Sequence, residues 1–196
     1  MSKLENTLKA FDAANTEDPN KETWEGKEYP KELIYGQRMS EMLGKYSEGE
    51  TPSETLQLAS RCQHIRRWTI PRSDYPMDRK GYLKWRTQLK IFHGEEAGKI
   101  MAEHGYDEET IQTVKDLLMK KNLKKDPESQ ALEDVICLVF LQYYYDDFLA
   151  KHPEEKIIEI LQKTWGKMTE KGHDHALQLQ YTDKGLLLVK RALGLA

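Results

Sequence analysis

The chain has little cysteine, little net charge and no long apolar run. Its two cysteines, Cys62 and Cys137, each fall inside an apolar helical pattern, which is typical of small buried side chains rather than of a disulfide bond. No apolar run approaches the ~20 residues that a membrane-spanning helix needs. The N-terminal stretch also lacks the continuous apolar core of a signal peptide. We therefore expect a cytoplasmic protein with no membrane partner.

The near balance of charge limits the classes of partner. The formal net charge is −3 over 196 residues, although 32% of the residues are charged. General binding of nucleic acid depends on a strongly basic surface that neutralises phosphates. Nucleic acid is thus not the expected partner, and any recognition of an anion has to be local. The composition carries no indication of an oligomeric state.

Alternation of apolar and polar residues, which is typical of β-strands, nowhere persists for more than a few residues. Helical spacing runs through most of the chain instead. We predict an all-α fold, a single-domain helical bundle of about eight helices over residues 1–196. An N-terminal helix over 3–18 packs on or over a helical core at about 30–172, and a C-terminal helix covers about 183–195.

Several residues mark where the expected helices begin and end. Ser53 and Asp107 each precede a helical pattern in the position of an N-cap. Pro127 and Pro153 stand where helices begin, which is the place that proline tolerates best. Gly105 follows a long helical pattern and is expected to end it. These signals predict the helix order along most of the core.

What the chain does contain is arginine confined to one stretch. Six of its eight arginines fall between Arg61 and Arg86, together with histidine, tryptophan and tyrosine, whereas lysine supplies most positive charge elsewhere. A guanidinium group binds carboxylate or phosphate through two hydrogen bonds and stacks on aromatic rings. The pattern therefore indicates an anion site. An alternative is a loop held by ion pairs from these arginines to Asp74 and Asp78.

The expected ligand is a small phosphorylated or otherwise anionic molecule. The side chains expected to bind it come from the arginine-rich stretch and from neighbouring helices. They are Tyr35, Arg61, Gln63, Arg67, Arg72, Arg79, Arg86 and Lys121. The polar segment DAANTEDP (residues 12–19) either folds over this pocket or serves as ordinary capping at the end of its helix.

Three ionisable residues are the candidate catalytic groups. His64 ends a mostly apolar helical pattern, His93 lies on the next helix, and Asp134 interrupts the most apolar helix of the chain. A buried carboxylate costs several kcal/mol unless it is paired. Two histidines and one aspartate from three helices would suit a divalent metal ion. Alternatively, Asp134 pairs with an arginine and the histidines only form hydrogen bonds.

The order of these features resembles the histidine–aspartate (HD-domain) phosphohydrolase superfamily, an all-α fold. The matching positions are Tyr35 in LIYGQRMSEML, Gln63 and His64 in LQLASRCQHI, and Asp134 in ALEDVICLVFL. The segment HGEEAGKIMAEHGYDEETIQTVKDLL, which starts at His93, is similar to the middle section of that superfamily. The chain departs from the superfamily pattern where Tyr35 replaces a histidine and Gln-His replaces His-Asp.

A closer resemblance covers nearly the whole chain. The strings RCQHIRRWTIPRSDYPMDRKGYLKWR, GYDEETI, KKNLKKDPESQALEDV and KTWGKM resemble a bacterial and fungal family defined as domain of unknown function 4202. The HD resemblance implies a phosphohydrolase in which arginines hold the anion, His64 and His93 bind a metal or transfer protons, and Asp134 orients a metal or water. The alternative is a non-catalytic protein that binds anions or nucleotides, because the replaced ligands weaken metal affinity.

Overall fold

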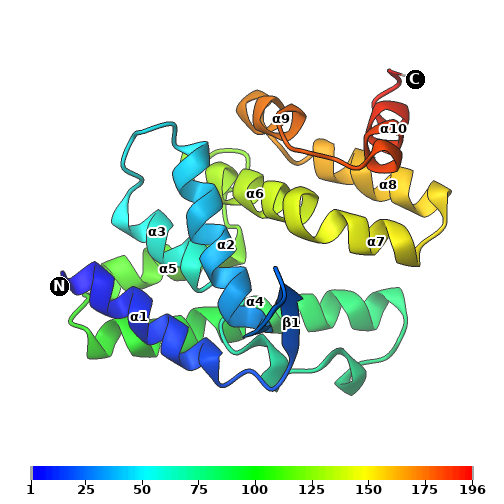
Figure 1. Ribbon diagram of the computed structural model, residues 1–196. Coiled ribbons are helices and arrows are strands. Elements are labelled where there is room, and N and C mark those ends of the chain that lie inside the picture. The colour runs from blue at the N-terminus through cyan, green and yellow to red at the C-terminus, as the bar shows by residue number, and fades with distance from the viewer. Residues whose placement is uncertain (1, 196) are drawn as a thin grey trace. The chain divides into compact units, whose positions relative to one another are not determined.

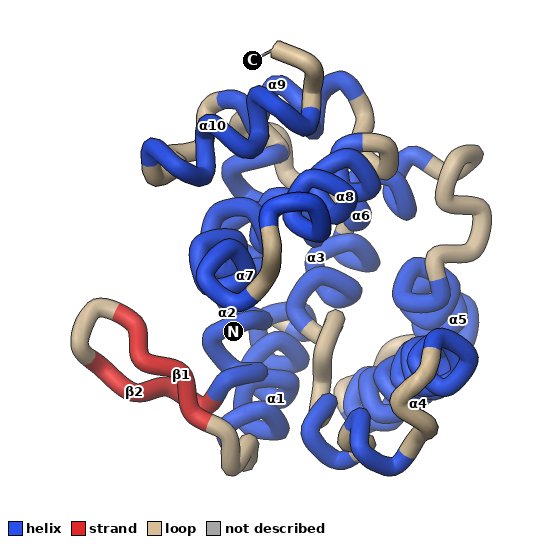
Figure 2. Tube along the Cα trace, turned by 90° about the vertical axis from the view of Figure 1, so that its right-hand side faces the viewer, coloured by secondary structure: helices blue, strands red, loops and turns tan. Residues whose placement is uncertain are grey.

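The computed structural model describes residues 2–195 (Figures 1 and 2). About 70% of the chain is helical, and the described residues form ten α-helices and one sheet of two strands. The expectation of a mostly helical protein is thus confirmed, while the number of helices exceeds the predicted eight. The chain forms two compact units, the first ending at Asn122 and the second beginning at Leu123.

The first unit contains five α-helices and the sheet. Two short helical turns lie in the arginine-rich stretch between the third and fourth helices. The elements are α1 (Lys3–Thr16), β1 (Lys21–Trp24), β2 (Lys27–Pro30), α2 (Lys31–Tyr46), α3 (Glu54–Arg61), the turns Arg67–Thr69 and Arg72–Asp74, α4 (Arg79–Glu103) and α5 (Glu108–Met119).

The second unit is entirely helical within the described residues. Its elements are α6 (Pro127–Val139), a π-helical turn (Phe140–Tyr144), α7 (Tyr145–Lys151), α8 (Glu154–Trp165), α9 (Glu170–Leu177) and α10 (Asp183–Ala192). Helix α9 was not predicted, because its sequence is polar and only Gly172 and Ala176 are buried on it. It accounts for part of the difference in helix number.

The sequence signals for helix ends are confirmed. The Ser53 hydroxyl accepts a hydrogen bond from Leu56 N at 3.1 Å, and the Asp107 carboxylate accepts one from Thr110 N at 2.7 Å. Pro127 is the first residue of α6. Each cap satisfies a backbone N–H group that the helix itself leaves unbonded.

The β-hairpin departs from the prediction of helices alone. Its two central residues, Glu25 and Gly26, have φ angles of 49° and 76°, which suit the type I′ turn that joins two antiparallel strands. The strands lack apolar alternation because most of the hairpin is exposed, and Figure 2 shows it projecting from the helices. The buried Arg38 of α2 holds it through an ion pair to Glu22 and a contact of 4.7 Å with the Trp24 ring.

Each unit has its own buried core. In the first unit, fully buried side chains come from α1 to α5 and from the segment after α3; they include Phe11, Met39, Leu58, Ile65, Met101 and Val114. In the second unit they come from α6, α7, α8 and α10; they include Leu132, Leu138, Tyr145, Ile157 and Leu188. None of the helices in residues 2–195 is long and apolar enough to cross a bilayer.

Helices α4 and α5 pack closely because glycine faces the contact. A Cβ atom added at Gly98 would lie 3.1 Å from Ile111 Cγ2 and 2.9 Å from Lys115 Cε, and one added at Gly94 would lie 3.3 Å from Lys115 Cγ. Such distances leave no room for a larger side chain without displacement. The close contact brings the end of α5, with Lys120, beside the first half of α4.

Candidate functional site

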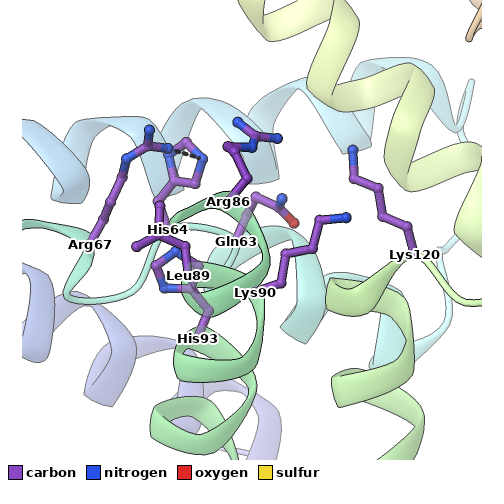
Figure 3. A pocket seen from close by; sticks show the side chains of 8 residues that line it. All are labelled: Gln63, His64, Arg67, Arg86, Leu89, Lys90, His93 and Lys120. Atoms are coloured by element: carbon purple, nitrogen blue, oxygen red, sulfur yellow. Dashed lines mark hydrogen bonds between the residues drawn. The ribbon is translucent and has the colours of Figure 1, made fainter. Parts of the chain in front are cut away.

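A pocket in the first unit gathers residues from three parts of the chain (Figure 3). Its volume is about 280 Å³ with the part open to solvent included. Because this figure counts space that is open to solvent, the enclosed part is smaller, and the space suits only a small ligand. The lining residues are Gln63, His64, Arg67, Arg86, Leu89, Lys90, His93 and Lys120.

Helix α4 supplies one wall of the pocket. Arg86, Leu89, Lys90 and His93 are spaced i, i+3, i+4 and i+7 along it, and this spacing places them on a single face of an α-helix. The Asp78 side chain caps the start of this helix by accepting a hydrogen bond from Gly81 N at 2.6 Å. Helical periodicity alone therefore brings these four side chains together.

The segment after α3 supplies His64 and Arg67. Between them, Arg66 has a φ angle of 49°, in the left-handed region that non-glycine residues seldom occupy. Its backbone N–H donates to Asn15 Oδ1 at 2.9 Å, and its guanidinium pairs with Glu17 at 3.2 Å. These contacts from the DAANTEDP segment hold the turn that presents the histidine and the arginine to the pocket.

The other polar residues of that segment have similar positions. The Asp12 carboxylate accepts two hydrogen bonds from the Arg61 guanidinium at 2.7 and 2.6 Å. Asp18 Oδ2 accepts one from Glu32 N at 3.0 Å, and Asn15 Nδ2 donates to Glu32 O at 3.3 Å. None of these three side chains lines the pocket; they tie α1 to α2 and α3.

The hydrogen bonds of His64 define its tautomer. Nε2 lies 2.9 Å from Arg67 NH1, and Nδ1 lies 3.2 Å from Glu32 Oε2. A guanidinium group only donates, so Nε2 is the acceptor and the ring proton sits on Nδ1, directed at the carboxylate. The Tyr35 ring stacks on the imidazole, with 4.0 Å between centroids and 11° between planes.

Burial and positive charge keep His64 neutral. Burial is the main cause that lowers its pKa well below the usual value, and the cations Arg67, Arg86 and Lys120 lower it further. These cations favour the neutral imidazole, because they would repel the positively charged, protonated ring. The ring therefore contributes a hydrogen-bond acceptor rather than a charge to the site.

His93 is also neutral and is almost fully buried, with 4% of its surface exposed. Its Nδ1 lies 2.8 Å from the Ile65 carbonyl oxygen, which can only accept, so Nδ1 carries the proton. Burial first, and then His64, lower the His93 pKa to about 3. Among the residues that the structure describes, its buried Nε2 has no hydrogen-bond partner.

Glu32, which the sequence reasoning did not select, lies next to His64 at the start of α2. It is 6% exposed, and burial raises its pKa, while Arg67 and Lys31 act in the opposite direction. Its Oε1 is 4.0 Å from Arg67 Nε. The sequence could have indicated Glu32, because it stands three residues before Tyr35 and the two side chains share one face of the helix.

The pocket is cationic. Arg67, Arg86, Lys90 and Lys120 line it without any carboxylate among the lining side chains, and Figure 3 shows them arranged around His64 and Gln63. Within residues 2–195, the Arg86 guanidinium forms no hydrogen bond or ion pair. Lys120 takes a left-handed φ of 57° where α5 ends, and this turn directs its side chain to the pocket rather than along the helix.

Other residues predicted to bind the ligand have different positions. Arg61 is paired with Asp12, and Arg72 donates to backbone carbonyls of its own loop at 2.9 and 2.7 Å. Arg79 is exposed in the first turn of α4, and Lys121 is bonded to an acidic side chain of α5 at 2.7 Å. None of them lines the pocket, whereas Gln63, Arg67 and Arg86 do.

The aromatic side chains of the arginine-rich stretch pack beside the pocket. Trp85 is 9% exposed, and its Nε1 donates to the Ile70 carbonyl at 2.9 Å. The Arg67 guanidinium lies 5.0 Å from the centroid of this indole ring. The contact is a cation–π interaction that restrains the guanidinium from one side.

Asp134 belongs to the second unit, where it is fully buried. Its carboxylate accepts hydrogen bonds from Thr169 N at 3.0 Å, from the Thr169 hydroxyl and from Gln130 Nε2 at 3.3 Å. Thr169 is the N-cap of α9, so this carboxylate stabilises the start of that helix. Its predicted role beside His64 and His93 stays a prediction.

A divalent metal does not suit the donors of the pocket itself. Both nitrogens of His64 already have partners, Arg67 and Glu32, and the remaining charged groups that line the space are cations. Within residues 2–195 there is also no group of three or more histidine, cysteine or acidic side chains placed to hold a metal ion. The chemistry of the lining favours an anion.

These features describe a mostly helical protein with a small cationic pocket beside two neutral histidines. Comparison with known families matches residues 5–189 to the domain of unknown function DUF4202. The chain belongs to this family. No curated protein and no solved structure matches it.

Proposed function

We propose that the first unit binds a small phosphorylated molecule or another small oxyanion in this pocket. The observation that carries the proposal is the meeting of Arg67, Arg86, Lys90 and Lys120 around a space with no carboxylate in its lining. Four cations around one space attract an anion, and charge-assisted hydrogen bonds are the strongest that such groups form.

Two features support a specific anion site rather than a solvated basic surface. The histidines beside the cations are held neutral, so neither adds repulsion between charges, and Nε2 of His93 offers a hydrogen-bond acceptor. His64 is held by its hydrogen bond to Glu32 and by the ring of Tyr35, and Arg67 by its hydrogen bond to His64. Side chains that are held in place before a ligand arrives lose less conformational freedom when they bind it.

The test compares two arginines of the same helix. Arg86→Gln removes a lining cation, whereas Arg79→Gln removes an exposed one outside the pocket. Titration with inorganic phosphate, followed by calorimetry, should show Arg86→Gln weakened by about tenfold or more, which corresponds to about 1.4 kcal/mol. Arg79→Gln should match the wild type. Equal affinity in all three proteins would contradict the proposal.

A second candidate is hydrolysis of a phosphate ester on an HD-like fold, favoured by the pairing of His64 Nδ1 with Glu32 at 3.2 Å. If Arg67 moved to the phosphate, Nε2 of His64 would be able to accept a proton from an attacking water. The water oxygen would bond to phosphorus, the ester P–O bond would break, and the released alcohol would take up a proton. Glu32 would stabilise the imidazolium formed in between.

Release of phosphate from small esters tests this second candidate. Assays with added Mn²⁺, Co²⁺, Ni²⁺ or Fe²⁺ and with a chelator would reveal dependence on a metal, as in the superfamily that the sequence resembles. Turnover that is lost in His64→Ala but kept in Arg79→Gln would support catalysis. Binding of phosphate without turnover under any of these conditions would leave the non-catalytic binding protein.

A further inference from the structure

Two polar atoms in the pocket lack any partner in the part of the chain that the structure describes. They are Nε2 of His93 and Oε1 of Gln63, both buried and both on residues that line the pocket. A buried polar atom left without a hydrogen bond costs about 1–3 kcal/mol. Such atoms are uncommon in folded proteins, and water or a bound ligand is the usual partner where the protein supplies none.

The Nδ1 atom of His93 determines whether Nε2 of the same ring donates or accepts a hydrogen bond. Because Nδ1 donates to the Ile65 carbonyl at 2.8 Å, the neutral ring has its lone pair on Nε2, which is therefore an acceptor. The groups that face this ring are His64, Arg67 and Glu32. Burial and, more weakly, Arg67 disfavour the imidazolium form, whereas Glu32 acts in the opposite direction; the lowered pKa leaves the atom as an acceptor at neutral pH.

Gln63 places a second hydrogen-bonding group in the same pocket. Its amide lies near Arg86 and Lys90 in Figure 3, and its oxygen has no partner among residues 2–195. An amide oxygen is an acceptor, as is the His93 lone pair. The pocket thus combines four cationic donors with two acceptors that none of these donors satisfies.

A ligand made only of oxygen acceptors would satisfy the cations and leave both acceptors unpaired. We propose that the pocket selects oxyanions that bring their own O–H group, with His93 Nε2 and the Gln63 amide oxygen accepting its hydrogen bond. This inference rests on the proposed function and names its ligand class. The O–H group belongs either to a protonated phosphate or to a hydroxyl on the organic part of a phosphate ester.

Phosphate and sulfate provide the direct test, because they share size and tetrahedral shape. Near pH 7 inorganic phosphate carries at least one P–OH group, whereas sulfate carries none. The full-length protein should bind phosphate at least about tenfold more tightly than sulfate, a difference of about 1.4 kcal/mol for one well-formed hydrogen bond. Calorimetric titration with each sodium salt at constant ionic strength measures this ratio.

Two variants assign the selectivity to the proposed acceptors. Gln63→Leu removes one acceptor at similar size, and His93→Leu removes the imidazole lone pair together with the donor to Ile65. Each should lower the phosphate-to-sulfate ratio by about threefold or more while sulfate affinity changes little. Arg86→Gln serves as the control, since it should weaken both anions alike. Circular dichroism of each variant checks that it is folded.

Two phosphate esters separate the sources of the O–H group. At about pH 8.5 an ester of phosphate is a dianion without P–OH, because its second pKa is about 6. Tighter binding of glycerol phosphate than of methyl phosphate then assigns the O–H to the organic part. Equal and weak binding of both esters, with strong binding of inorganic phosphate, assigns it to phosphorus.

The failure of this inference is distinct from the failure of the proposed function. Equal affinity for phosphate and sulfate in the wild type, with both weakened in Arg86→Gln, would overturn the selection of an O–H group but keep the anion site. An unchanged ratio in both Gln63→Leu and His93→Leu would overturn the assigned acceptors. If neither anion binds, the anion site itself is wrong.

Discussion

The Nε2 atom of His64 lies 2.9 Å from the guanidinium nitrogen NH1 of Arg67. A histidine and an arginine this close are compatible only if the imidazole is neutral and accepts the hydrogen bond. If an anion attracted Arg67, the histidine nitrogen would lose its donor and become available to the ligand.

The first prediction concerns pH. The folded-state pKa of His93 is lowered to about 3 from its ordinary value of 6.5, and that of His64 is also well below 6.5. At a pH between the folded-state pKa of each histidine and its ordinary pKa, the unfolded chain binds more protons than the folded chain. Stability should therefore fall as the pH drops below about 6.5, by up to about 1.4 kcal/mol per pH unit for each histidine.

Urea unfolding from about pH 7.5 to about pH 5 checks this slope before most carboxylates titrate. His93→Gln should flatten the profile, because its contribution to proton uptake on unfolding is removed. A wild-type profile that is already flat in this range would contradict the prediction.

The second prediction concerns Lys120, whose φ of 57° is strained for a residue with a side chain. Lys120→Gly should raise the free energy of unfolding by about 1 kcal/mol, since glycine adopts this conformation without steric cost. Lys120→Ala keeps the strain and should not be stabilised. Both variants lose a lining cation, so both should bind phosphate more weakly than the wild type.

Chemical unfolding and phosphate titration of the two variants measure these effects separately. We expect a gain in stability only in the glycine variant and a loss of phosphate affinity in both variants. This result would indicate that the lysine is retained for binding at the expense of stability. The prediction fails if Lys120→Gly is less stable than the wild type or if it binds phosphate equally well.

The third prediction compares two glycines of α2. A Cβ atom added at Gly36 would lie 2.8 Å from the Arg61 carbonyl oxygen, whereas one at Gly44 would have no neighbour within 4 Å. Gly36→Ala should lower stability by about 1–3 kcal/mol because α2 and α3 would have to separate. Gly44→Ala should raise it by about 0.5–1 kcal/mol through the better helix propensity of alanine.

Thermal unfolding of both variants gives the comparison, and the phosphate titration extends it to the site. Because Gly36 is next to Tyr35, whose ring stacks on His64, Gly36→Ala should also weaken anion binding. Gly44→Ala should leave binding unchanged. Stabilisation by both substitutions would show that the contact between the two helices is looser than the structure has it.

The fourth prediction concerns Asp134 in the second unit. Asp134→Asn removes one of the two carboxylate oxygens that Thr169 and Gln130 contact. We expect a loss of about 1–3 kcal/mol in stability, since buried donors lose their acceptor. Phosphate affinity should remain at the wild-type value, because the lining of the pocket lies in the first unit.

Calorimetry and unfolding of the same Asp134→Asn preparation separate the two roles of this residue. Unchanged stability together with lost phosphate binding or lost turnover would favour the catalytic role predicted from the sequence. Thr169→Val provides the matched control, because it removes the hydroxyl that the carboxylate accepts from while the carboxylate itself remains.

The helices could be predicted from the sequence because their signals are local. Ser53 and Asp107 cap helices through side chains that reach only three residues ahead. The hairpin escaped prediction because its strands are exposed and carry no apolar alternation, so the Glu25-Gly26 turn was its main signal. Local sequence rules therefore predict whether a segment is a helix or a strand wherever a cap or a buried face marks it.

The candidate site could be predicted only in part. The sequence predicted an anion site in the arginine-rich stretch, and of the residues it selected there, Gln63, His64, Arg67 and Arg86 line the pocket. It could not separate Arg61 from Arg67, since Arg61 is held by Asp12, a residue 49 positions away in the chain. Nor could it separate Lys121 from Lys120, because the choice depends on the left-handed backbone at the end of α5. Tertiary partners and backbone conformation decide both cases.

The contact between Arg67 and Trp85 gives the protein an optical signal of its own. The guanidinium lies 5.0 Å from the indole ring, and the emission of a tryptophan depends on the charge beside it. An oxyanion that draws Arg67 away would change that emission without any attached dye. With Trp24, Trp68 and Trp165 replaced by phenylalanine, the fluorescence of the remaining indole would report occupancy in real time.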